Sequence, residues 1–204
     1  MKNHLEYNWW IYLLILILPI FLWCSVFNIL AKPAPEEQLN VLYVGQQLDA
    51  QALQQQLEQA MPALTQQELL QIHVNTEIVG PAELSMILTA RIFYYDLIIV
   101  QESYCTNYIG QNVFGMIPPA LLEQFPDAQI YTEEIPKENL VLNFGFIVYD
   151  GTTRNRFSAH YQGEETCYLF LSPKSVNFDT LNKNGEKGND AALKAAQYLL
   201  EAAP

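Results

Sequence analysis

The chain has 204 residues and a formal net charge of −12, from 22 acidic and 10 basic side chains. So acidic a protein is repelled by phosphate backbones and by anionic lipid surfaces, so we exclude nucleic acid as a partner. Lys2 and Glu6 cancel, and every other charged side chain lies after residue 31. Cationic ligands and basic protein surfaces are compatible with this charge, which solubility alone also explains.

An uncharged apolar run from Trp9 to Leu30 opens the chain. As a helix it would be roughly 33 Å long, which matches a hydrocarbon core of about 30 Å. We predict a transmembrane helix at 9–31, after a short cytoplasmic tail at 1–8 and before a Pro-containing linker at 32–38. A cleavable signal peptide is the alternative, but its apolar region is shorter and ends in a small-x-small site, which residues 29–31 match poorly.

The direction of this helix is a separate question. Lys2 is offset by Glu6, while Lys32 opens the other side, so the charge bias gives little indication. A signal anchor that exports a long, acidic C-terminal domain fits the arrangement, because long domains cross membranes largely regardless of charge. We therefore expect a single-pass protein of the cell membrane with an extracytoplasmic domain at 39–204, and cytoplasmic placement stays open.

Strand and helix patterns alternate through the first part of the domain. A buried strand at 39–45 precedes an amphipathic helix that Asp49 can cap. A second strand at 68–76 leads to a helix that begins with Gly80-Pro81, and the apolar run at 97–101 is typical of a central parallel strand. Strands separated by helices in this way predict right-handed βαβ units.

The later segments are less regular. A short helix is predicted at 119–125, strands at 129–131, 143–149 and 166–171, a polar loop at 182–189 and a final helix that ends near residue 201. The chain after the membrane helix has the length of one domain. We predict the α/β class, as a three-layer sandwich-like lobe with a mainly parallel sheet and some antiparallel late strands.

Catalytic and metal-binding motifs are missing from the sequence. It contains no HExxH, CxxC, DxDxDG, GxGxxG or GxSxG pattern. The neighbouring pairs at 133–134 and 164–165 are interpreted as surface charge, and His160 has no partner at ligand spacing. We therefore predict no catalytic residue, metal or cofactor, and we do not expect an enzyme.

The loop after the third strand is the one candidate binding site. Ligands of open α/β sheets bind at the carboxyl ends of such strands. The polar and aromatic side chains suited to a small ligand are Gln101, Glu102, Ser103, Tyr104 and Asn107. A connecting loop without a ligand has the same composition.

The cysteines of the chain allow one possible disulfide in the domain. Cys24 lies in the apolar run, so Cys105 and Cys167 are the thiols of the domain. In an oxidising compartment these two are a possible disulfide, or they stay unpaired, depending on the distance between their Cα atoms.

The order of elements resembles one lobe of the periplasmic-binding-protein-like fold. The stretches that carry this resemblance are LNVLYVG, TARIFYYDLIIVQE, GFIVYD, CYLFLS and ALKAAQYLLE. Small membrane-anchored bacterial proteins of unassigned function look similar. The resemblance implies solute recognition, but members of that family close two lobes over the solute and this chain has residues for one. Two hypotheses follow: a non-enzymatic interaction or sensing module that meets a protein partner, or a solute-binding accessory of a transporter or receptor.

Overall fold

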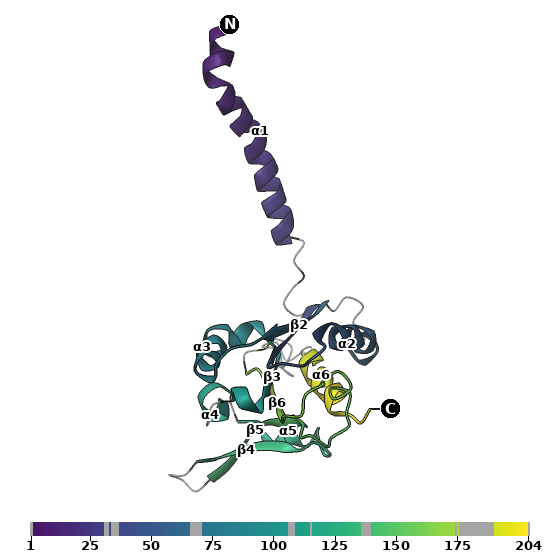
Figure 1. Ribbon diagram of the computed structural model, residues 1–204. Coiled ribbons are helices and arrows are strands. Elements are labelled where there is room, and N and C mark those ends of the chain that lie inside the picture. Colours follow the sequence, from purple (N-terminus) through teal and green to yellow (C-terminus); the bar gives the residue numbers. More distant parts are fainter. Residues whose placement is uncertain are drawn as a thin grey trace. The chain divides into compact units, whose positions relative to one another are not determined.

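The computed structural model describes residues 2–30, 33, 37–65, 71–105, 109–114, 116–135, 140–173, 175 and 190–203 (Figure 1). The chain divides into two compact units, Met1–Ala34 and Pro35–Pro204. The first consists of one helix, and the second contains a six-stranded sheet with its helices.

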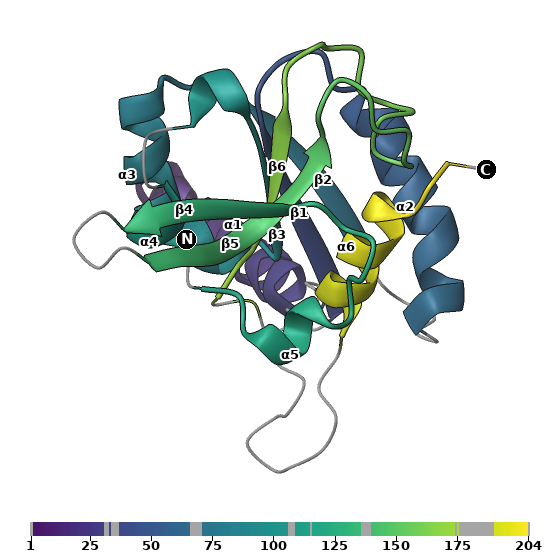
Figure 2. The ribbon, with the colours of Figure 1, turned by 90° about the horizontal axis from the view of Figure 1, so that it is seen from below.

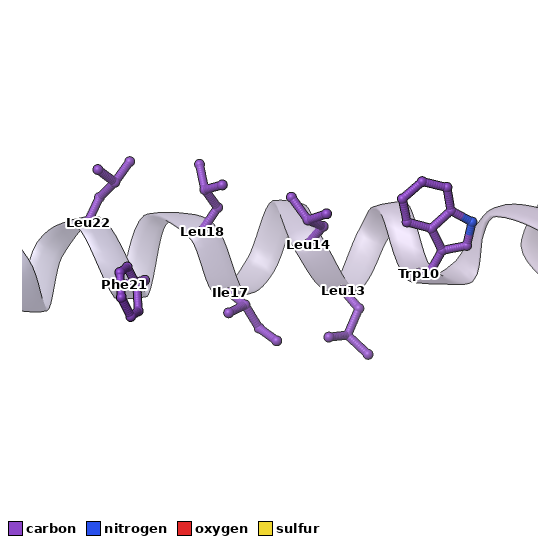
Figure 3. A pocket seen from close by; sticks show the side chains of 7 residues that line it. All are labelled: Trp10, Leu13, Leu14, Ile17, Leu18, Phe21 and Leu22. Carbon is purple, nitrogen blue, oxygen red and sulfur yellow. The ribbon is translucent and has the colours of Figure 1, made fainter.

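Helix α1 (Lys2–Leu30) is apolar on every side from Trp9 to Cys24. Its stretch Trp9–Phe27 is long and apolar enough to cross a membrane, and none of that stretch is buried. Side chains four residues apart form two rows along the helix, one of them containing Trp10, Leu14, Leu18 and Leu22 (Figure 3). A helix that is hydrophobic all round needs an apolar surrounding such as lipid.

The sheet of the second unit has the strand order β2-β1-β3-β6-β5-β4. Its strands are β1 (Gln38–Val44), β2 (Gln71–Glu77), β3 (Leu97–Gln101), β4 (Ile130–Ile135), β5 (Leu140–Tyr149) and β6 (Cys167–Leu171). β2, β1 and β3 are parallel, whereas β6, β5 and β4 join antiparallel. The sheet is therefore mixed, and the expected mainly parallel sheet is not confirmed.

Helices contact both faces of this sheet. They are α2 (Ala50–Thr65), α3 (Pro81–Arg91), η2 (Ile92–Tyr94), η3 (Glu102–Tyr104), α4 (Ile109–Val113), α5 (Pro119–Leu122) and α6 (Ala191–Leu200). Side chains alternate along each strand, so Tyr43 packs in one buried cluster with α2 and α6 while its neighbour Val44 packs in another with α3. Figure 2 shows α2 and α6 on one side of the sheet and α3 and α4 on the other.

The early elements form where the sequence predicts them, and the late ones differ. β4 and β5 are longer than expected because they pair as an antiparallel hairpin. Asp150 ends β5 with a turn in which its Oδ1 accepts hydrogen bonds from Thr152 and Thr153. The predicted polar loop at 182–189 lies outside the described residues.

Candidate functional site

The ends of β1 and β3 make the topological switch point of the sheet. From β1 the chain runs through α2 to β2, and from β2 it returns through α3 to β3 on the other side of β1. Since α2, which follows β1, and α4, which follows β3, pack against opposite faces, the loops after β1 and β3 diverge at this edge. Ligands of open α/β sheets bind at such a point. We call it the carboxyl edge: residues 45–48, which follow β1, and residues 101–105, which start with the last residue of β3.

Gln101 fills the space between these two loops. Its side chain is only 4% exposed, and its Oε1 accepts a 2.9 Å hydrogen bond from the backbone N–H of Gln46. The Tyr43 hydroxyl lies 3.5 Å from the same oxygen and donates to the Gln46 carbonyl at 2.7 Å. Gln101 therefore holds the turn after β1 in place of a ligand.

Gly45 permits this close approach. Its φ of +153° is a backbone conformation that side chains rarely adopt, and a Cβ there would lie 2.5 Å from Gln101 Oε1. Glycine is thus needed at position 45 to bring the backbone against Gln101, and no phosphate is required to explain it.

The other candidate loop residues are held by the protein itself. Glu102 donates its backbone N–H to the Thr166 carbonyl at 2.8 Å, and the N–H of Ser103 donates to Glu165 Oε2 at 3.2 Å. Tyr104 accepts a 3.1 Å hydrogen bond from the Gln46 amide through its hydroxyl. Asn107 lies outside the described residues.

A segment at 156–166, which no pattern in the sequence indicated, covers the turn after β1. Tyr161 pairs with Leu48 in an isolated antiparallel bridge, and the N–H of Gln162 donates to the Gln47 carbonyl at 2.9 Å. His160 also holds this segment to α2: its Nε2 lies 2.6 Å from Gln56 Oε1, and because an amide oxygen only accepts, the ring donates this hydrogen bond from Nε2–H.

Cys105 and Cys167 are both free, so of the two possibilities that the sequence leaves open, a disulfide or unpaired thiols, this structure has the second. Cys167 is buried in the cluster with Tyr43 and Tyr161, whereas Cys105 packs against the cluster on the opposite face of the sheet. Burial raises the pKa of each thiol to about 12. A reactive cysteine needs a lowered pKa and access, and neither thiol has the pKa of a nucleophile.

The interpretation of the pair at 133–134 as surface charge is wrong for Glu133, which is buried. Its side chain is 7% exposed, while that of Glu134 is exposed, because neighbours on a strand face opposite sides. Its Oε1 accepts hydrogen bonds from the backbone N–H of Gly110 at 2.6 Å and the Tyr131 hydroxyl at 2.9 Å. Burial, followed by this hydrogen bond to Glu133, raises the pKa of Tyr131. The alternation of the strand was the signal available in the sequence.

No group of three His, Cys, Asp or Glu side chains that could hold a metal comes together among the described residues. The groove in Figure 3 runs along α1 and has only apolar side chains and Trp10 in its lining, so it offers no chemistry to a polar ligand. Comparisons with protein-family models, curated proteins and solved structures found no significant match.

Proposed function

We propose that this protein is a membrane-anchored, non-enzymatic interaction or sensing module, with α1 as a single-pass anchor and its α/β domain outside the cytoplasm. The observation that carries the proposal is the closed carboxyl edge. Gln101 and Tyr104, two groups expected to meet a solute, hydrogen-bond to Gln46 instead. A ligand would have to displace these contacts before it could use the same groups.

Support for the anchor comes from the exposure of α1, whose apolar side chains are not buried against the rest of the described chain. A soluble helix turns one stripe to a core, but the side chains of Trp9–Phe27 are not buried anywhere in the chain. Exposing so much apolar surface to water is unfavourable in free energy, and burying it in lipid removes that cost. The proposed direction, with the domain outside, rests on the long acidic domain that follows the helix.

The state of the thiols and of His160 supports a non-enzymatic role. The two thiols have raised pKa values, and His160 is hydrogen-bonded to Gln56. The lobe, with helices on both faces of its sheet, keeps its proposed resemblance to half of a periplasmic-binding-protein-like fold. The described part of the domain forms this one lobe around a single sheet, and its outer surface is available to a partner.

The anchor and its direction are tested by protease. We expect the full chain to stay in the membrane pellet after an alkaline wash, and protease added outside intact cells to digest the domain. A chain that washes off contradicts the anchor. A domain that survives while an external control protein is digested contradicts the direction alone.

The choice between partner and solute is tested by ligand screening of the full chain in detergent. We expect amino acids, sugars and small anions to leave the unfolding temperature unchanged. A compound that raises it in the natural chain and not in Tyr104→Phe or Gln101→Ala variants would establish the solute-binding alternative, because a ligand that binds only the native state stabilises it.

A further inference from the structure

Two adjacent aromatic residues of the domain face solvent. Phe93 and Tyr94 form η2, and their side chains are 52% and 67% exposed. Their ring centroids are 5.1 Å apart and the planes are inclined by 63°. Among the described residues of the domain they are the only aromatic side chains that are exposed, since every other one is buried or half-buried. So much apolar surface in one place is a common mark of a contact site.

The pair lies at the edge of the sheet where β1 begins, which we call the amino edge. Asp96, two residues after Tyr94, donates its backbone N–H to the Asn40 carbonyl at 2.8 Å, and its Oδ2 accepts from the Asn40 N–H at 2.7 Å. β1, which begins at this edge, is the first strand after α1, and only residues 31–37 separate the two elements in the sequence. Even fully extended, a segment of that length reaches less than about 30 Å.

We propose that Phe93 and Tyr94 contact the interfacial region of the phospholipid bilayer that α1 crosses. This inference rests on the anchoring proposed above. Aromatic rings, and tyrosine in particular, favour the headgroup level, where the ring meets apolar chains and the hydroxyl stays hydrated. The short covalent connection makes the contact effectively intramolecular, so a weak attraction is sufficient.

The charges beside the pair are compatible with a neutral lipid surface. Arg91, the residue directly before η2, forms an ion pair with Glu77 at 3.2 Å. The acidic domain as a whole is repelled by anionic lipid. The lipid that fits is therefore zwitterionic, with phosphatidylcholine as the probe.

Tryptophan fluorescence provides the test, because all three tryptophans of the chain, Trp9, Trp10 and Trp23, lie in α1. These are replaced by Phe in the full chain, and Phe93→Trp then adds one reporter. Met86→Trp on α3 is the matched control, since Met86 is 69% exposed. Each chain is reconstituted in phosphatidylcholine vesicles with and without lipids brominated near the headgroup.

We expect the reporter at 93 to emit at shorter wavelength and to lose at least about half of its emission to brominated lipid, while the reporter at 86 stays unquenched. Adding Tyr94→Glu should reduce the quenching at 93, because a carboxylate is poorly soluble at that depth. If Phe93→Trp does not fold, Tyr94→Trp replaces it.

Three other results would overturn the inference. Equal quenching at 93 and 86 in a chain that resists an alkaline wash leaves the anchor standing and removes the lipid contact. A shift to shorter wavelength without lipid quenching assigns the pair to a second copy of the chain. A chain released by the wash refutes the anchor itself, and with it the tether on which the contact depends.

Discussion

The carboxyl edge and the amino edge of the parallel strands differ in whether their polar and aromatic side chains are free to bind a partner. At the carboxyl edge, where ligands of this kind of sheet bind, Gln101, Tyr104 and the turn after β1 hydrogen-bond to one another. At the amino edge, the buried Asp96 fixes the start of β1, and Phe93 and Tyr94 face outward. The comparison teaches that position in a fold does not make a binding site, because the groups placed there must also be free to bind.

The largest effect is expected at the amino edge, for Asp96→Ala. The carboxylate is 5% exposed and accepts hydrogen bonds from the Asn40 N–H and the Ser175 hydroxyl. Losing it leaves a partly buried N–H unsatisfied, which should cost about 3 kcal/mol in the free energy of unfolding, measured in urea. Asp96→Asn keeps one acceptor and should lose less. Equal and small losses in both variants would show that the carboxylate does not hold this edge.

At the carboxyl edge, Gly45→Ala should cost about 2 kcal/mol of unfolding free energy, from backbone strain and the contact with Gln101 Oε1. Gly151→Ala is the matched control. Its φ is also positive, at +86°, but the nearest atom to a Cβ is 3.8 Å away. That variant should lose only about 1 kcal/mol.

A double variant sharpens this test. In a Gln101→Ala chain the nearest atom to the new Cβ, Oε1, is gone, although the Tyr43 hydroxyl at 2.7 Å and the Cβ of residue 101 at 2.9 Å remain. Gly45→Ala should therefore be roughly 1 kcal/mol less costly than in the natural chain. Strictly additive losses would mean that Gln101 does not close the space beside Gly45.

The raised pKa values of the two thiols predict that the protein loses stability at alkaline pH. In the unfolded chain they ionise near pH 8.5, whereas in the folded protein their pKa is about 12. The folded state therefore binds more protons above pH 8.5, and stability falls as pH rises. By pH 10 each thiol should contribute a loss of order 1 kcal/mol. Cys167→Ala should remove its share of the slope, and an unchanged slope in that variant would contradict the burial of the thiol.

The smallest effects distinguish two buried tyrosines under the carboxyl edge. Tyr43→Phe removes the 2.7 Å hydrogen bond to the Gln46 carbonyl and should cost about 1 kcal/mol. The Tyr161 hydroxyl is buried without a hydrogen-bond partner, so Tyr161→Phe should change the unfolding free energy by less than about 0.5 kcal/mol. A larger loss for Tyr161→Phe would reverse the assignment of the two hydroxyls.

Local patterns were sufficient for α1 and for the units from β1 to β3. Val41 to Val44 and residues 97–100 are continuous apolar runs because both faces of the central strands are covered, and such runs are visible without a structure. The late strands were harder. β6 pairs antiparallel with β3 although they are far apart in sequence, and no local pattern records which strand a later one will join.

In the candidate loop, too, local sequence predicts which residues are present, and distant segments decide whether they are free. The sequence correctly places polar groups directly after β3, but whether they are free depends on Gln46, Glu165 and Thr166, which reach them from other segments. The buried Glu133 and the opposite placement of the two thiols depend likewise on which face of the sheet each residue occupies.

By itself, the sequence determined a helix long and apolar enough to cross a membrane and an acidic α/β domain after it, because hydrophobic period and charge are local properties of the chain. Only the tertiary structure decided that the carboxyl edge is closed, that the thiols stay apart and that Phe93 and Tyr94 face outward. Those outcomes depend on pairing and packing between distant segments, where the same residue types can be buried, bonded or left exposed.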